Sequence, residues 1–469
     1  MDFISFLQEH VAISIWIIGA VALLSGIVAF YKNFSDICAM VLKIKSGIGK
    51  LFNLHKKIRR RKYNAIVSSE DYLKWQNEIL NDIYNPIIKK FNENNRSLNN
   101  VTCEKAVIFS NTDNAYYYEA VYFQVDENKY SYPFTSICNK DELIKCRISE
   151  KKFKHTKYID YKPSDRNQRS FYNLMKPTIR FPDNIGYALD KMTFENGFHF
   201  TAKACTYKMN VCTSNIMEYE LYKLYLKERK HKCADKDKLG ELKTRNKIHK
   251  YYKENIENIF TNGAGRISLL GVQAMVLCKN YFTGNYDALR IRRSENVDAK
   301  SGFLQFVPSG GFSALNNSFD YDTQYAEFSV TKAILRELLE ECFGEEDFSG
   351  RRLNSTESIY SDRIINKLLN NEKLIFKFIG SAFSLVSLRH ELCFLLVIDD
   401  RELVDLIREN EECSSVIQFI SINNLEQQSF WIYNVGSAQI NDCKLLNPTS
   451  AALWNLVQNS DTYKKLKWQ

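Results

Sequence analysis

The sequence predicts a chain in three parts: one membrane-spanning helix at the N-terminus, an α+β middle region, and a C-terminal region of strands and helices. Three observations predict this fold class. A run of 21 residues without a charge comes first, β-rich runs follow in the middle, and an amphipathic helix lies between apolar strands near the end. The N-terminal part comprises 1–32 (outer tail and transmembrane helix) and 33–62 (basic juxtamembrane segment), and the other two parts are 63–262 (α+β region) and 263–469 (C-terminal domain).

Charge and composition exclude several classes of protein. The chain has 64 Lys and Arg against 55 Asp and Glu, a net charge of +9. Residues 32–62 carry ten basic residues and one acidic residue, which equals the whole net charge, so no duplex nucleic acid partner is expected. Hydrophobic residues make up 45% of the chain, which excludes a disordered protein. The 12 cysteines contain no CxxC pair, so a zinc ribbon is excluded. We expect them to be buried thiols in a reducing compartment.

The first element is the uncharged segment Val11–Tyr31, which as a helix would be about 30 Å long and would match the apolar thickness of a bilayer. Acidic residues precede it and basic residues follow it, so the positive-inside rule places the N-terminus outside and the bulk of the chain in the cytoplasm. We therefore expect a single-pass protein of the cell membrane. A cleaved signal peptide and a buried core helix are the alternatives.

Small residues within this segment predict helix association. Ala22 and Gly26, and Ser25 and Ala29, have the spacing that lets two helices approach closely, so we expect a homo-oligomer. In the next stretch, apolar residues from Ile37 to Leu51 recur at helical spacing between lysines. This pattern is typical of a segment that lies on an anionic lipid bilayer, although it could also extend the spanning helix.

The middle region is predicted to mix helices and strands. Ser69 precedes a helical pattern that reaches Asn94 and contains Pro86. Runs at 105–110, 115–125, 129–135 and 198–212 favour strands, and a helix is expected from about Asn215. No catalytic signature is visible in this region.

A second basic stretch closes the middle region. Lys223–Lys253 contains twelve Lys and Arg residues and four acidic residues. It is either a solvated helical face or a surface for an anionic partner such as a nucleotide or lipid head groups.

The C-terminal region begins with two apolar strands, Leu270–Lys279 and Ala288–Arg293. A third strand follows at Gly302–Phe312 and runs into a turn that contains Gly310 and Gly311. Adjacent glycines permit tight geometry and let the backbone approach a ligand closely, so these two are candidate substrate-binding residues.

An acidic helix follows this turn, with Ser329 as its predicted cap. Glu337, Glu340 and Glu341 stand at i, i+3 and i+4 and therefore share one face, whereas the leucines lie mostly on the other. Three clustered carboxylates repel one another unless a cation lies among them. An all-oxygen site suits Mg²⁺ or Mn²⁺.

A strand, a glycine-rich turn and a helix with the sequence Arg-Glu-Leu-Leu-Glu-Glu at 336–341 together resemble the Nudix hydrolase signature. The resemblance covers about residues 264–459 and implies an α/β/α sandwich with a mixed sheet. It implies that Glu337, Glu340 and Glu341 bind the metal and that Arg336 orients them by pairing with an upstream glutamate, for which Glu327 is the candidate. The catalytic loop differs from the family pattern by an insertion of about ten residues.

The resemblance also implies a reaction, the hydrolysis of a nucleoside diphosphate linked to another group, with metal ions that neutralise the diphosphate and activate water. Arg292 and Arg293 could contact phosphate or form surface ion pairs. Glu391 could be a fourth catalytic carboxylate or base, or one half of a polar pair with its neighbour His390.

The order of the three parts resembles the membrane-anchored Nudix effectors of bacterial CBASS anti-phage systems. This resemblance implies an effector in the bacterial inner membrane that responds to a nucleotide signal such as a cyclic oligonucleotide, and that acts on the membrane or hydrolyses a nucleotide. Two alternatives stay open: a membrane-tethered, Mg-dependent nucleotide pyrophosphohydrolase, and a Nudix-fold binding module without activity.

Overall fold

The computed structural model describes most of the chain from residue 58 onward. The described residues are 16, 19–20, 22–25, 58–95, 101–107, 117–125, 127, 162–176, 185–194, 198–231, 237–293, 303–314, 327–343, 362–414, 417–423, 425 and 446–467. The chain divides into two compact units, Met1–Lys62 and Tyr63–Gln469. All the named helices and strands below belong to the second unit.

The predicted transmembrane helix is corrected by the structure. In the part of the chain that is described, no helix is both long enough and apolar enough to cross a membrane. This finding overturns the spanning helix at Val11–Tyr31 and the placement of the chain in a cell membrane. Within this segment the structure describes residues 16, 19–20 and 22–25, and the rest of it lies outside the described residues. The absence of charged residues was therefore not sufficient to predict a membrane-spanning helix.

The second unit contains both strands and helices throughout its described residues. The strands are β1 (Thr102–Val107), β2 (Tyr117–Gln124), β3 (Ile185–Thr193), β4 (His199–Thr206), β5 (Gly271–Lys279), β6 (Tyr286–Arg292), β7 (Leu304–Phe306), β8 (Ser309–Gly311), β9 (Ile375–Ser384), β10 (Arg389–Ile398) and β11 (Ile417–Ser421). The helices are α2 (Glu70–Asn94), α3 (Arg166–Met175), α4 (Tyr207–Asn210), η3 (Val211–Asn215), α5 (Ile216–His231), α6 (Lys238–Glu241), α7 (Lys243–Tyr251), η4 (Ile256–Ile259), α9 (Val330–Cys342), α10 (Arg363–Leu369), α11 (Arg401–Ser414), α14 (Pro448–Asn459) and α15 (Asp461–Lys467).

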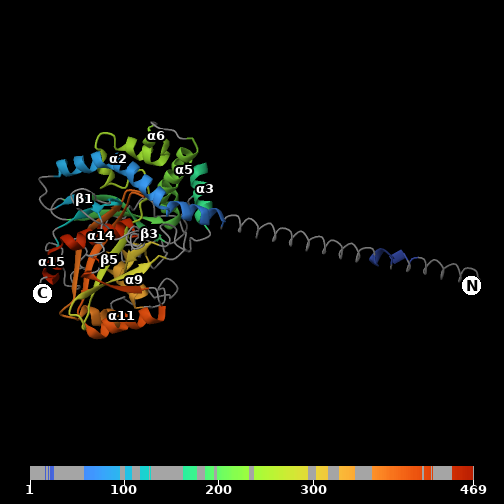
Figure 1. The fold of residues 1–469 in the computed structure, drawn as a ribbon. Helices are drawn as coiled ribbons and strands as arrows, with labels where there is room; N and C mark the ends of the chain where they lie inside the picture. The colour runs from blue at the N-terminus through green and yellow to red at the C-terminus, as the bar shows by residue number, and fades with distance from the viewer. Residues whose placement is uncertain are drawn as a thin grey trace, which may run out of the picture. The chain divides into compact units, whose positions relative to one another are not determined.

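A nine-stranded mixed sheet organises this unit (Figure 1). Its order is β1-β2-β9-β10-β5-β6-β11, with β7 paired to β6 and β8 paired to β5. The central pair, β5 and β10, is parallel, and the other pairs are antiparallel. The mixed sheet expected for the C-terminal region is therefore present, and strands from the middle region extend it.

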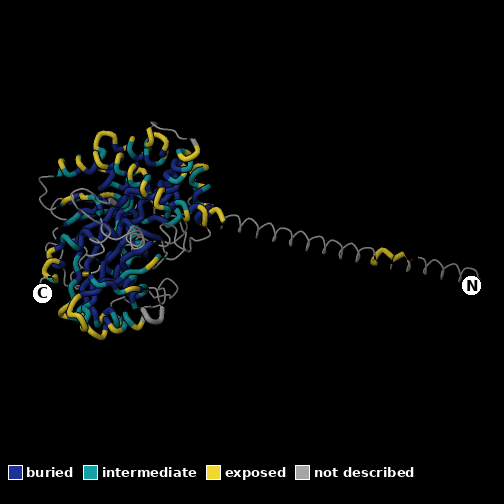
Figure 2. Tube along the Cα trace, in the orientation of Figure 1, coloured by how far each residue is buried: buried dark blue, intermediate teal, exposed yellow. Residues whose placement is uncertain are grey.

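Helices cover both faces of the sheet, and alternate residues of β5 show which helix covers which face. Val272, Ala274 and Val276 pack in one cluster with the apolar residues of α9. Met275 and Leu277 pack in a second cluster with those of α14. A central strand that is buried on both faces has a continuous run of apolar residues, and the sequence of β5 has this pattern because both of its faces are covered by helices. Figure 2 shows the buried strands beneath exposed outer helix faces.

The middle region joins the same sheet through β2, which pairs with β9 from Ala120↔Ser384 to Gln124↔Gly380. The expected strands at 105–110 and 115–125 correspond to β1 and β2, whereas the expected strand at 129–135 lies outside the described residues. The pattern at 198–212 forms a strand only as far as Thr206. There the Thr206 side chain accepts a hydrogen bond from the Met209 amide and caps α4, so the chain turns into helix.

The turn between β9 and β10 is held by Arg245 of the middle region and by Arg266, which follows shortly after that region. The buried guanidinium of Arg245 donates to the carbonyls of Leu385 and Val386 at 2.8 and 2.6 Å. Leu388, whose φ is +54°, accepts from Arg266 Nε at 3.0 Å. Because each contact joins the turn to residues more than a hundred positions away, the turn ties the two halves of the sequence together.

Candidate functional site

The acidic helix α9 begins where the sequence predicts. The Ser329 hydroxyl accepts a hydrogen bond from the Lys332 amide at 3.3 Å, which satisfies a free donor at the helix start. Leu335, Leu338 and Leu339 are buried in the core. Burial of this apolar face directs the glutamates of the helix toward the neighbouring strand β8.

Strand β8 lies directly against those glutamates. Ser309, Gly310 and Gly311 pair with Gln273, Val272 and Gly271 of β5, so the strand is fixed in register. A Cβ atom on Gly310 would overlap the carboxylate of Glu337. The absence of a side chain at Gly310 therefore makes room for that carboxylate against the backbone.

Arg336 orients the first glutamate. Its guanidinium donates to Glu337 Oε1 at 3.0 Å and to the Ser313 carbonyl at 3.2 Å. Its Nε lies 3.9 Å from Glu340 Oε1. The side chains of Arg336 and Glu337 are 8% and 14% exposed, so water screens their pairing only weakly.

Glu341 occupies the inner end of the site. Its Oε2 accepts a hydrogen bond from the Ser309 amide at 2.7 Å. The residue as a whole is partly exposed, but its carboxyl end points inward. Burial of this carboxyl, together with the charge of Glu337, raises its pKa to about 8, although the Ser309 amide and Arg293 act in the opposite direction.

The donor set of this cluster fits a hard divalent cation. Three carboxylates from one helix face supply oxygen ligands, and the raised pKa of Glu341 means that its negative charge lacks full compensation. Within the described residues, however, no three His, Cys, Asp or Glu side chains are arranged so that they could hold a metal ion. Glu337 faces Arg336 and Glu341 faces Ser309, so metal binding requires these carboxylates to turn toward a common point.

Arg292 and Arg293, the two predicted phosphate contacts, differ in how closely they are associated with Glu341. Arg293 acts electrostatically on Glu341, and it donates to the Gln305 side chain. Its Nε is buried and has no hydrogen-bond partner in the described residues. Arg292 ends β6 and is exposed. Of the two, Arg293 is therefore the better placed to meet an anionic group beside Glu341.

Glu327 does not pair with Arg336 in the structure. Glu327 precedes the cap of α9, and its carbonyl accepts from the Ser329 amide at 2.9 Å. The described contacts of Arg336 go to Ser313, Glu337 and Glu340, which differs from the pairing with Glu327 that the family pattern implies.

Glu391 lies on the other face of the sheet. It pairs with Gly271, and a Cβ atom on Gly271 would come within 2.7 Å of the Glu391 Cγ. In a strand, alternate residues share a face, so Glu391 shares the face of Cys393 and Leu395, which pack with α14. Gly310 and Glu337 belong to the α9 face, so the structure does not bring Glu391 to the three glutamates.

Sequence reasoning missed two groups that shape the site. The Ser309 amide and the Ser313 carbonyl hold Glu341 and Arg336. Both are backbone groups, which every residue has, so the residue type hardly predicts which of them will form these hydrogen bonds. The position of Ser309 directly before two glycines was the available hint.

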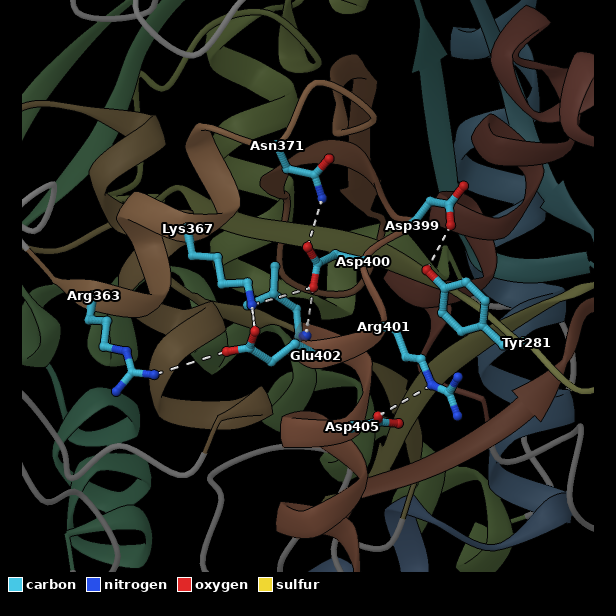
Figure 3. Close-up of polar contacts among 10 residues, drawn as sticks. Tyr281, Arg363, Lys367, Asn371, Asp399, Asp400, Arg401, Glu402 and Asp405 are labelled. Atoms are coloured by element: carbon cyan, nitrogen blue, oxygen red, sulfur yellow. Dashed lines mark hydrogen bonds and ion pairs between the residues drawn. The ribbon is translucent and has the colours of Figure 1, made fainter.

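A second polar cluster, at the far end of β10, has a structural role (Figure 3). Asp400 Oδ1 accepts from the Leu403 amide at 3.0 Å and so caps α11. Lys367 of α10 reaches Asp400 at 3.8 Å and also pairs with Glu402. The Tyr281 hydroxyl donates to Asp399 at 2.7 Å. These carboxylates have protein partners, so the cluster ties α10 and α11 to the sheet.

No family model and no curated protein matches this chain.

Proposed function

We propose that the Tyr63–Gln469 unit is a metal-dependent hydrolase of the Nudix type that cleaves a diphosphate linkage in a nucleoside diphosphate derivative. The observation that carries this proposal is the packing of Gly310 and Ser309 against the glutamate face of α9. A glycine-rich strand that presses on three clustered carboxylates is the arrangement in which the backbone can come close to a diphosphate beside a metal ion.

Each residue of the site has a distinct role in this proposal. Glu337, Glu340 and Glu341 would hold Mg²⁺ or Mn²⁺, which when bound supplies charge neutralisation for the diphosphate and a more acidic water. Arg336 holds Glu337 in place through a hydrogen bond at 3.0 Å. Ser309 fixes Glu341 through its amide. Arg293, whose buried Nε has no hydrogen-bond partner among the described residues, would donate to a phosphate oxygen.

One alternative has a specific observation in its favour: a Nudix-like module that binds a nucleotide without turnover. Arg336 and the Ser309 amide already engage Glu337 and Glu341. If these contacts persist in solution, the carboxylates cannot converge on a cation, and binding would occur without hydrolysis. The membrane-acting effector depended on the spanning helix, which the structure overturns, so it is not part of the proposal.

The test is a screen of nucleoside diphosphate derivatives with the full-length protein in Mg²⁺ or Mn²⁺, with a phosphatase to release phosphate from the products. Hydrolysis is expected to need the metal and to fall at least about 100-fold in the double variant Glu340→Gln, Glu341→Gln. The matched control is Glu254→Gln, Glu372→Gln, which changes two exposed glutamates elsewhere and should keep full activity.

Binding distinguishes the two candidates. A nucleotide at 100 times its Kd stabilises the protein by about 2.7 kcal/mol whether or not it is cleaved. Stabilisation without any metal-dependent product supports the binding module and contradicts the hydrolase. Neither stabilisation nor product with any nucleotide tested contradicts both.

A further inference from the structure

Helices α5 and α7 carry lysines at the same spacing. On each helix the lysines follow one another after four and then three positions, which places them on one helix face. We call this set the lysine row; its members are Lys223, Lys227 and Lys230 of α5 and Lys243, Lys247 and Lys250 of α7.

The lysine row faces outward along its whole length. All six lysines are exposed, whereas Leu221, Leu224 and Tyr225 of α5 and Arg245 and Ile248 of α7 are buried on the opposite sides. Figure 2 shows exposed residues along the outer side of α5, which Figure 1 labels.

The two triplets adjoin at Lys223 and Lys243, because the charge of Lys243 acts on Lys223. Lys227 pairs with Glu241 at 2.8 Å, and the Thr244 amide donates to Glu220 at 2.9 Å, so the chain reverses direction between α5 and α7. From the point where Lys223 and Lys243 approach, the α5 lysines lead away in one direction and the α7 lysines in the other. Three lysines spaced over seven residues extend about 10 Å along each helix.

Most of the row lacks neutralising partners. In the described part of the chain, Lys227 pairs with Glu241, but Lys243, Lys247 and Lys250 form no ion pair. Burial lowers the pKa of Lys223, and Arg166 and Lys243 lower it further, although Glu220 and Asp165 raise it. Like charges four positions apart on a helix repel one another, and a chain of negative charges would relieve this repulsion.

An exposed aromatic ring lies beside the α7 lysines. Tyr251 is 66% exposed, and it follows Lys250 and stands four positions after Lys247. Among the described residues of α5, α6 and α7, no Leu, Ile, Phe or Trp is exposed in the way that insertion into a lipid surface requires. A tyrosine ring among lysines is instead the combination that stacks a base and holds its phosphates.

We propose that the lysine row and Tyr251 form a binding surface for single-stranded nucleic acid. The phosphates would lie along the row, and a base would stack on Tyr251. The α5 part of this surface is separate from the proposed hydrolase site, because α5 lies in the upper part of the unit in Figure 1 and α9 lies in its lower half. The proposal stands whether or not the hydrolase proposal holds.

The test measures the affinity of the full-length protein for a fluorescent single-stranded oligouridine by anisotropy at several salt concentrations. Each phosphate contact contributes about 0.7 to the slope of log affinity against log salt, so Lys247→Gln, Lys250→Gln should reduce the slope by about 1.4. Tyr251→Ala should weaken binding about 5- to 150-fold, and Tyr251→Phe should bind as the natural protein does. All these positions are exposed, so the variants should fold.

The matched control is Lys464→Gln, Lys465→Gln on α15, which removes two exposed charges elsewhere and should leave the slope unchanged. An equal effect of both double variants would overturn the proposal, because it would show that only net charge matters. Binding of polyglutamate or of phosphatidylserine vesicles with the same dependence on Lys247, Lys250 and Tyr251 would also overturn it, in favour of an acidic protein or a lipid surface. A duplex of the same length should be insensitive to Tyr251→Ala.

Discussion

The carboxylate of Glu337 occupies the space that a side chain on Gly310 would fill. This contact joins the acidic helix to the glycine-rich strand. The geometry of the candidate site therefore depends on the absence of a side chain at Gly310. The neighbouring glycine has no such constraint, because a Cβ atom on Gly311 would meet only Leu269 Cδ2 at 3.6 Å.

Gly310→Ala should therefore damage the site, whereas Gly311→Ala should not. The added methyl must push Glu337 or the strand aside, and a displacement of about 1 Å at a reacting group costs on the order of 100-fold in rate. We expect metal-dependent hydrolysis to fall by about this factor in Gly310→Ala and to stay within about twofold in Gly311→Ala. Equal activities would show that Glu337 has room to adapt.

Arg336→Met should destabilise the protein strongly. Glu337 is 14% exposed, and without Arg336 its charge would be left nearly buried and unpaired. Removal of one partner of a buried ion pair costs about 3–5 kcal/mol. Urea unfolding would measure the loss. The double variant Arg336→Met, Glu337→Gln should recover part of it, and no recovery would mean that Arg336 stabilises the fold mainly through Ser313.

His390 should make the fold sensitive to acid. Its Nε2 donates to the Phe260 carbonyl at 2.6 Å, and its Nδ1 contacts the Ser381 hydroxyl at 2.8 Å, so the buried ring is held neutral. Burial lowers its pKa to about 3. A group with a lowered pKa stabilises the fold fully above its unfolded value of about 6.5, and that stability is lost as the pH falls toward 3.

The shift corresponds to at most about 5 kcal/mol over this pH range. Urea unfolding between pH 3 and 8 should show a steep acid limb that becomes shallower in His390→Gln, which cannot take up a proton. Parallel acid limbs in the natural protein and the variant would show that another group, such as His249, controls acid unfolding.

Arg245→Met should destabilise the protein by about 3 kcal/mol or more. The change removes hydrogen bonds to the Tyr84 hydroxyl and to the carbonyls of Leu385 and Val386, and it leaves those acceptors buried without donors. The control is Lys247→Met on the exposed face of the same helix, for which we expect a change within about 0.5 kcal/mol. Equal effects would mean that helix propensity explains both variants.

Local patterns predicted the parts of the fold that local interactions control. The cap at Ser329 and the shared face of Glu337, Glu340 and Glu341 follow from spacing along one helix, and the structure contains both. The alternating runs that became β1 and β2 were also visible, but their pairing with β9 was not, because it joins residues that are more than 250 positions apart.

The errors have equally specific causes. The uncharged run at Val11–Tyr31 carried the prediction of a spanning helix, although hydropathy alone does not establish a continuous helix. Glu391 was considered a candidate because it lies in an apolar strand beside His390. The face of the sheet on which it lies depends on the strand register, and a shift of one residue would reverse that face.

The turn at Leu385–Leu388, which Arg245 and Arg266 hold, also limits where the chain can be divided into fragments for expression. A fragment that begins at residue 263 would keep the candidate site but lose Arg245 and β2. Strand β9 would then become an open edge, which readily pairs with other chains. The C-terminal half should thus be insoluble when expressed alone, and the middle region acts for it as a built-in folding partner.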